Sequence, residues 1–141
     1  MTQMIFINLP VADVDASARF YEAVGATRND TFSDESCASM LISDTITAML
    51  LSHGRWRDFT SKQIPDAKTS AQVLLCLSME SRAACDAAVD AVVKAGGVAD
   101  PVPKQDHGFM YGRSYEDPDG HIWEVMWMDR AGMERSMAAE R

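Results

Sequence analysis

Apolar and polar positions follow one another in the same order twice along the chain. In each half an apolar stretch typical of a strand comes first, and a helix-capping residue (Asp13 or Ser81) and apolar positions three to four residues apart come next. A glycine (Gly25 or Gly96) ends each helical pattern, and three short stretches typical of strands follow it. The predicted strands are 4–9 (which Pro10 should end), 27–32, 37–43 and 46–52, then 72–78, 98–102, 109–115 and 122–128; the predicted helices are 14–24 and 82–95.

One strand, one helix and three strands, repeated once, predict an α+β fold of two βαβββ modules that form a curved mixed sheet around a cavity. Module one covers about residues 4–52 and module two about 71–129. A linker at 53–70, with one helical turn near 56–60, joins them. A tail at 130–141 is expected either to form a short amphipathic helix or to fray. At 141 residues, the two modules are expected to make a single domain.

The strongest local signal is a hairpin whose turn is Asp117-Pro118-Asp119-Gly120. Side chains alternate between the two faces of a strand, so Glu124 shares a face with Ile122, Met126 and Met128. An unpaired carboxylate in an apolar row is costly to bury. Glu124 is therefore expected to have a metal, a hydrogen-bond donor or a catalytic role, unless it is simply a satisfied or edge-exposed side chain.

The composition of the chain disfavours some classes of function. The chain has 13 Lys and Arg against 21 Asp and Glu, a formal net charge of −8, which disfavours nucleic-acid binding. It has no apolar run of membrane-spanning length and no basic n-region at its start, so we expect a soluble cytoplasmic protein without membrane contacts. The three cysteines, Cys37, Cys76 and Cys85, lie in apolar segments and are expected to be reduced and buried. The ten methionines are either core filler or the lining of an adaptable pocket.

Two motifs resemble the vicinal oxygen chelate superfamily, which includes glyoxalase I, bleomycin resistance proteins and extradiol dioxygenases. Residues 8–25 (NLPVADVDASARFYEAVG) resemble the opening of such proteins, and residues 116–124 (EDPDGHIWE) resemble their closing strand motif. The resemblance spans about residues 4–129. Segments between these motifs resemble a bacterial branch that is labelled glyoxalase-like or lactoylglutathione-lyase-like and has no established reaction; they are 32–36, 81–82, 95–97 and 106–114.

The resemblance also bears on metal binding, because four strand positions supply the ligands in the metal enzymes of this superfamily. These positions fall on Phe6, Met49, a residue of the apolar stretch 73–76, and Glu124. Only Glu124 is a ligand of the usual kind; a shift in register would bring Gln72 or Cys76 to the third position. A hard divalent ion needs several oxygen or nitrogen ligands. The resemblance therefore implies no cofactor, and a divalent metal is the disfavoured alternative.

Several side chains are candidates for the pocket. The expected ligand contacts are Asn8, Met49, Tyr111, Arg113, Glu124 and Met126. Asn8 and Tyr111 could equally be structural, and Arg113 is expected to pair with Glu124, with Glu116 or with an acidic ligand. The candidate catalytic residues are Glu124, as a base, and His107, which lies beside a glycine in a loop and could be an acid or base or simply solvated.

Two functions remain open on these residues, beside a purely structural role. The first is a glyoxalase-like protein that binds a small molecule in a cavity between the modules and acts as a lyase or dioxygenase-type enzyme. The second is a metal-free protein that sequesters a small molecule, as bleomycin resistance proteins do. The resemblance also implies a homodimer.

Overall fold

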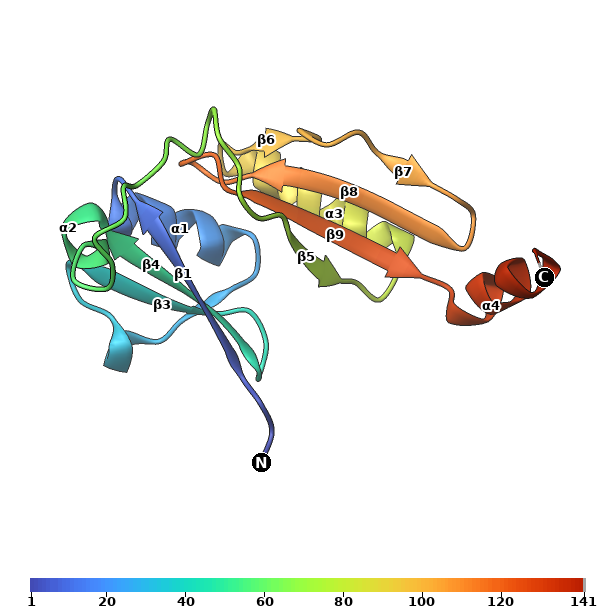
Figure 1. Ribbon diagram of the computed structural model, residues 1–141, viewed down its shortest axis with the longest axis horizontal. Coiled ribbons are helices and arrows are strands. Elements are labelled where there is room, and N and C mark those ends of the chain that lie inside the picture. Colours follow the sequence, from blue (N-terminus) through green and yellow to red (C-terminus); the bar gives the residue numbers. More distant parts are fainter. Residues whose placement is uncertain (141) are drawn as a thin grey trace. The chain divides into compact units, whose positions relative to one another are not determined.

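The structure, a computed structural model, describes residues 1–140 and divides the chain into two compact units, one over Met1–Ser70 and one that starts at Ala71. Each unit contains one sheet and a helix packed against it (Figure 1). In both units a first strand leads into the helix, and the remaining strands of that sheet follow. The α+β fold with a repeated strand–helix–strands order is confirmed.

The first unit has a four-stranded sheet in the order β1-β4-β3-β2. Strand β1 is parallel to β4, whereas the other pairs are antiparallel. Helix α1 packs on β3 and β4 through a buried side that includes Ala18, Phe20 and Tyr21. The elements are β1 (Ile5–Val11), α1 (Val14–Ala23), β2 (Thr27–Arg28), η1 (Asp30–Phe32), β3 (Cys37–Leu41), β4 (Ile46–Ser52) and α2 (His53–Trp56).

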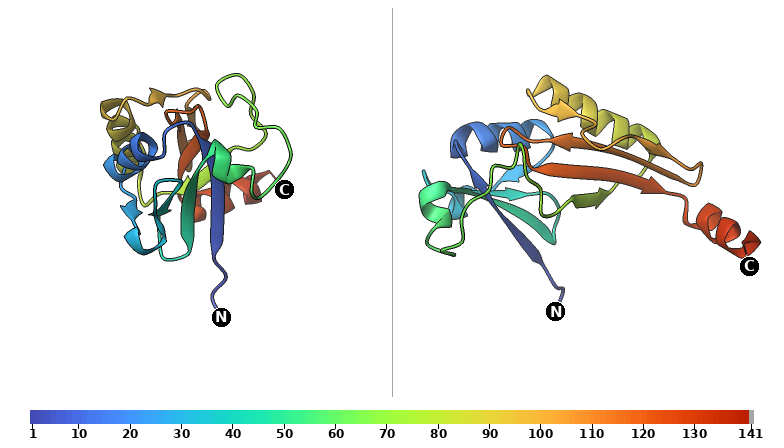
Figure 2. Two further views of the ribbon diagram at one scale, coloured as in Figure 1. Left: turned by 90° about the vertical axis from the view of Figure 1, so that its left-hand side faces the viewer. Right: turned by 45° about the horizontal axis from the view of Figure 1, so that its top comes forward.

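The second unit repeats this topology in the order β5-β9-β8-β6, with the short β7 also paired to β8. Again the first strand, β5, is parallel to the last, β9, and the others are antiparallel. Helix α3 lies along one face of β8 and β9 (Figures 1 and 2). The elements are β5 (Leu75–Ser78), α3 (Arg82–Lys94), β6 (Val98–Ala99), β7 (Gln105–Asp106), β8 (Met110–Glu116), β9 (Ile122–Met128) and α4 (Arg130–Ala139).

The helix boundaries follow from the predicted caps. The Asp13 side chain accepts a hydrogen bond from the Ala16 backbone N–H at 3.0 Å, and Ser81 does the same for Ala84 at 3.0 Å. Gly25 and Gly96, with φ of +111° and +90°, directly follow the C-caps of the two helices. Glycine is the residue that reaches this left-handed region without steric cost.

Several predicted elements differ from the structure. Strand β1 runs through Pro10 to Val11, which is tolerated because β1 is an edge strand and the missing N–H interrupts no ladder on its outer side. The strand predicted at 27–32 has only two residues, because the Asn29 side chain accepts from the Thr31 N–H and starts the 3-10 turn η1. The linker helix begins earlier than predicted, at His53, and β7 was not predicted.

The cysteine prediction is wrong at one position. Cys37 and Cys85 are buried free thiols, but Cys76 is exposed. The cause is the short β5 at the edge of its sheet, where alternate residues face away from helix α3. On α3 itself, Cys85 joins Val89 and Val92 in the buried stripe, while Val93 is 54% exposed.

No helix within residues 1–140 is long and apolar enough to cross a membrane.

Replacing Gly96 by alanine should destabilise the protein by about 1–2 kcal/mol, because an L side chain is strained at positive φ. The matched control is Gly54→Ala: a new Cβ meets no atom within 4 Å at either glycine, and only Gly96 has positive φ. Gly54→Ala should leave stability unchanged or raise it, since alanine favours a helix. Denaturant unfolding measures both, and equal effects of the two substitutions would contradict the assignment.

Candidate functional site

The turn between β8 and β9 fixes which residues of the hairpin face each other. The Asp117 carboxylate accepts backbone N–H bonds from Asp119, Gly120 and His121 at 2.9–3.0 Å. Gly120 takes a φ of +100°, as the turn sequence predicts. The resulting register sets Glu124 opposite Ser114.

The two faces of this hairpin have different environments. Tyr111, Tyr115, Trp123 and Val125 are all at most 5% exposed and belong to the face on which α3 packs. Alternation along β9 then puts Glu124, which is half-buried, on the opposite face. Within the second unit that face carries no helix (Figure 2). The packing of α3 therefore determines where the carboxylate lies.

Equivalent rows of three residues cross the two sheets. In the second unit the row is Cys76 on β5, Glu124 on β9 and Ser114 on β8. In the first unit, Asn8, Met49 and Ser39 hold the corresponding places on β1, β4 and β3. The internal repeat thus makes Glu124 the counterpart of Met49, and Cys76 the counterpart of Asn8.

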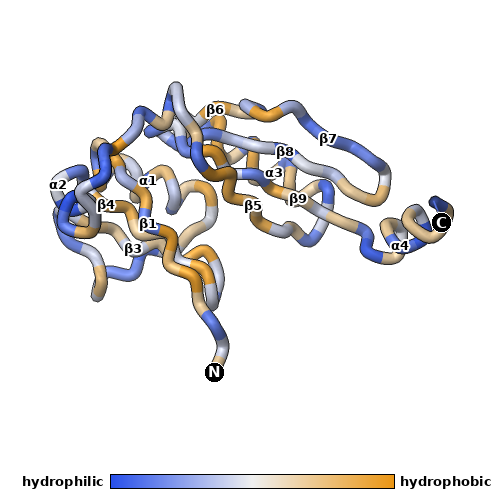
Figure 3. Tube along the Cα trace, viewed as in Figure 1, coloured by the Kyte–Doolittle hydropathy of each residue, from blue (hydrophilic) through white to orange (hydrophobic). Residues whose placement is uncertain are grey.

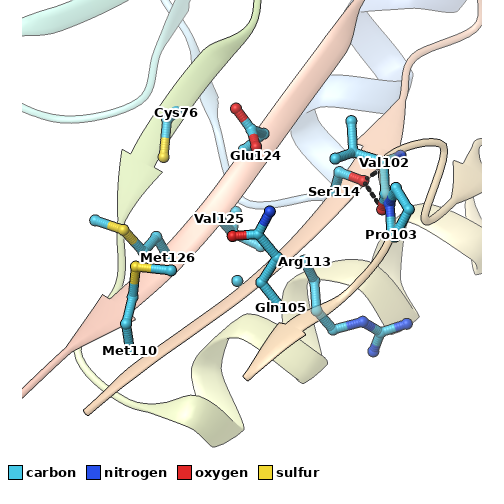
Figure 4. A pocket seen from close by; sticks show the side chains of 11 residues that line it. Cys76, Val102, Pro103, Gln105, Met110, Arg113, Ser114, Glu124, Val125 and Met126 are labelled. Carbon is cyan, nitrogen blue, oxygen red and sulfur yellow. Dashed lines mark hydrogen bonds between the residues drawn. The ribbon is translucent and has the colours of Figure 1, made fainter. Parts of the chain in front are cut away.

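A small pocket of about 60 Å³ opens around Glu124 in the second unit (Figure 4). Ser114 fixes the Val102 backbone at one side of the pocket. Its hydroxyl both donates to the Val102 carbonyl and accepts from the Val102 N–H, each at 3.0 Å. Gly112 contributes no side chain to this face. The lining includes the side chains of Cys76, Gln105, Met110, Ser114, Glu124 and Met126.

Glu124 has no protein partner in this pocket. Among residues 1–140, the structure contains neither a hydrogen bond nor an ion pair to its carboxylate. The neighbouring Cys76 thiol has a raised pKa. Partial burial is the main cause, and the negative charge of Glu124 is the second. A half-buried carboxylate without a protein donor can accept hydrogen bonds or a proton from a bound molecule.

The comparisons with known proteins agree with this architecture. The family model described as Glyoxalase/Bleomycin resistance protein/Dioxygenase superfamily matches residues 3–125. The chain belongs to this superfamily. None of the curated proteins compared with it matches at a significant level.

Several solved structures share the fold. A hypothetical protein from S. aureus is 25% identical, with a TM-score of 0.74 over 90% of this chain and 94% of its own. A glyoxalase-related enzyme from Fulvimarina pelagi is 21% identical, with a TM-score of 0.73 over 90% of this chain and 88% of its own. A glyoxalase/bleomycin resistance protein/dioxygenase family enzyme from Burkholderia phytofirmans PsJN is 15% identical, with a TM-score of 0.72 over 90% and 99%.

The superfamily's usual metal positions do not suit a hard divalent ion in this chain. Phe6 is two residues before Asn8 on β1, and by the internal repeat its counterpart is Leu74, two residues before Cys76. Phe6, Leu74 and Met49 offer no oxygen or nitrogen donor. No cluster of three or more His, Cys, Asp or Glu with metal-binding geometry occurs among residues 1–140. The donor set at these positions does not fit Zn²⁺, Mg²⁺ or Ca²⁺.

Tyr111 and Arg113 do not meet Glu124. Their side chains lie on the opposite face of β8, and the Arg113 guanidinium points away from Glu124 (Figure 4). The Tyr111 hydroxyl donates to Asp86 on α3 at 2.5 Å, and Arg113 donates to Asp86 at 3.1 Å and to both oxygens of Asp100 at 3.1 and 2.7 Å. These contacts raise the pKa of Arg113, chiefly through Asp100.

The other predicted residues are distributed between the units. Met126 lies beside Glu124 in the pocket, as predicted from alternation. His107 is exposed in the β7–β8 loop, where its ring stacks on Phe109, and it does not line the pocket. Asn8 and Met49 are paired with each other on the first unit's sheet.

Sequence reasoning missed several pocket side chains as ligand-contact candidates, among them Cys76 and Gln105. Cys76 lies in a stretch that reads as a fully apolar buried strand, so its exposed face was not evident. Gln105 reaches the pocket through β7, a two-residue strand with no hydrophobic pattern of its own. The pairing of β5 with β9 was the signal that could have identified Cys76, by analogy with β1 and β4.

The network around Arg113 predicts a specific loss of stability in acid. Hydrogen bonds from Tyr111 and Arg113 lower the pKa of Asp86, and Arg113 lowers that of Asp100, both below 3.8. A carboxylate with a lowered folded-state pKa stabilises the protein above its unfolded value and loses that stabilisation as pH falls through the folded value. Wild-type stability should therefore drop as the pH falls below the ordinary range of an aspartate, about 4.

Arg113→Met should flatten this dependence, because it removes the donor that lowers both values. Arg19→Met is the control: Arg19 pairs with Asp15 on an exposed helix surface, where an ion pair contributes little. Denaturant unfolding at several pH values measures all three proteins. The same pH dependence in Arg113→Met and wild type would contradict the role assigned to Arg113.

Proposed function

We propose that this protein binds a small organic molecule in the second-unit pocket, and that the Glu124 carboxylate holds a cationic or hydrogen-bond-donating group of that molecule. The observation that carries the proposal is the absence, among residues 1–140, of any protein donor to Glu124. Desolvating a charged group is unfavourable unless something compensates it. A donor on the ligand would supply that compensation.

The lining of the pocket supports a ligand with both an apolar and a polar part. Met110 and Met126 present flexible, polarisable side chains, which adapt to the apolar part of a ligand. Gln105 adds an amide that can donate and accept hydrogen bonds. At about 60 Å³ the pocket suits a polar head group, with the remainder of the molecule extending over the open sheet face. The formal net charge of −8 favours the approach of cations.

Glyoxalase-like lyase chemistry is the second candidate function. It is supported by the same carboxylate, because a half-buried Glu124 on the wall of a pocket can act as a general base without a metal. A dioxygenase-type reaction has less support, because three of the four metal positions carry Phe6, Leu74 and Met49. Simple sequestration requires only the binding step.

Replacing Glu124 by leucine should preserve or raise stability and abolish ligand binding, because no protein group loses a partner. The test is thermal unfolding with and without a compound found by screening small amines, guanidines and thiol adducts against the wild type. At a concentration one hundred times Kd, such a compound should stabilise the wild type by about 2.7 kcal/mol and the variant not at all.

Glu80→Leu is the matched control, since Glu80 is an exposed carboxylate outside the pocket. It should leave ligand stabilisation unchanged. A Glu124→Leu protein that is destabilised and still binds the compound would contradict the proposal, because Glu124 would then be a structural group.

We also propose a homodimer. Its support is the apolar character of both sheet edges (Figure 3): Ile5 and Phe6 on β1 are 54% and 57% exposed, and Val73 and Leu74 beside β5 are 60% and 50% exposed. Exposed apolar edges favour association. Sedimentation at micromolar concentration should give a dimer, and Phe6→Ser should weaken it. A wild-type monomer at that concentration would contradict this proposal.

A further inference from the structure

We propose that the second-unit pocket also binds a soft monovalent metal ion, Cu(I), through the sulfur atoms of Cys76, Met110 and Met126. This site differs from the superfamily's usual metal positions in its residues and in its donor chemistry. It does not rest on the small-molecule function proposed for Glu124, because none of its three ligands is a carboxylate.

The strand register brings the three sulfur side chains to one place. Cys76 pairs with Glu124, so Met126, two residues further along β9, lies diagonally across from Cys76 on the same face. Met126 pairs in turn with Gly112, and Met110, two residues before it on β8, is the diagonal neighbour on the other side. Diagonal neighbours on a sheet are within reach of long side chains.

The side chains of these three residues extend into one pocket. All three line the same pocket, and Figure 4 shows the sulfur atoms of Met110 and Met126 at one end of it with the Cys76 thiol directed toward them. Met126 and Met110 are half-buried, whereas Cys76 is exposed and open to solvent. A metal ion can therefore enter from the open sheet face and meet a thiol and two thioethers.

The three sulfur donors determine which metal the site favours. Thiolate and thioether sulfur are soft ligands that favour Cu(I), while Mg²⁺ and Ca²⁺ require oxygen. On binding, the S–H bond of Cys76 breaks and a sulfur–copper bond forms. The proton leaves to solvent, and the copper remains Cu(I), so no oxidant or reductant is needed.

A simpler explanation is that Met110 and Met126 are only apolar lining and that any copper binds the exposed thiol by itself. The two explanations differ in one property. Only in a three-sulfur site does the Cu(I) affinity depend on the Met110 and Met126 thioethers. The other cysteines do not provide a competing site, since Cys37 and Cys85 are buried. Leucine is the suitable replacement for methionine, because it conserves volume and removes the sulfur.

The experiment is an anaerobic titration of the reduced full-length protein with Cu(I) in competition with a chromophoric Cu(I) chelator. The wild type should bind one Cu(I) per chain, and Cys76→Ser should bind none. Met110→Leu and Met126→Leu should each weaken binding by at least about tenfold. Met137→Leu, which changes an exposed methionine on α4, is the control and should bind like the wild type.

Three results would overturn the proposal: Cu(I) binding by Cys76→Ser, wild-type affinity in both pocket methionine variants, or loss of binding in Glu124→Gln. The last result would show a carboxylate-centred site. Circular dichroism of each variant establishes that it is folded. Glu124→Leu, which should abolish binding of the screened organic compound, should retain Cu(I), so failure of this proposal is distinguishable from failure of the small-molecule function.

Discussion

The packing of helix α3 on one face of the β8–β9 hairpin is the constraint on which the rest of the site depends. Trp123 and Val125 are almost completely buried on the helix side. Because side chains alternate along a strand, their burial forces Glu124 to the other face. The Asp117 carboxylate, with three backbone N–H bonds, prevents a one-residue slip that would exchange the two faces. Glu124 is therefore kept on the open face by apolar packing, without a hydrogen bond of its own.

The two faces of this hairpin consequently have different roles. On the helix side, Tyr111 and Arg113 bind Asp86 and Asp100 and tie β8 to helix α3 and to the segment after β6. That side therefore carries a network of charged and hydrogen-bonded side chains. The open side has few internal polar contacts apart from the Ser114–Val102 pair. Its groups remain available to a bound molecule.

The donor groups on the open faces depart from the superfamily's metal enzymes in a consistent direction. A carboxylate is retained at Glu124, but its counterpart in the first unit is Met49, and Phe6 and Leu74 replace nitrogen or oxygen ligands. Sulfur and apolar groups thus occupy places that would need hard donors. This is the physical basis for proposing organic-ligand binding at Glu124 and a soft-metal site beside it.

The sequence by itself determined the elements with strong local signals. The strands 46–52 and 122–128 were predicted with their observed bounds, and the Asp13 and Ser81 caps and both helix-ending glycines are confirmed. These features depend on residues a few positions apart, so local chemistry is sufficient to specify them. The same holds for the shared face of Glu124 and Met126, which follows from alternation alone.

Only the tertiary structure decided which segments of chain face one another. Arg113 and Tyr111 were expected near Glu124, yet they bind Asp86 on α3, because strand alternation alone does not say which face the helix covers. Cys76 was expected to be buried and is exposed, because an edge strand next to β9 presents alternate residues to the open face. Long-range pairing of β5 with β9 brings Cys76 beside Glu124, a place that the sequence offered to Cys76 only through a shift in the register of that strand.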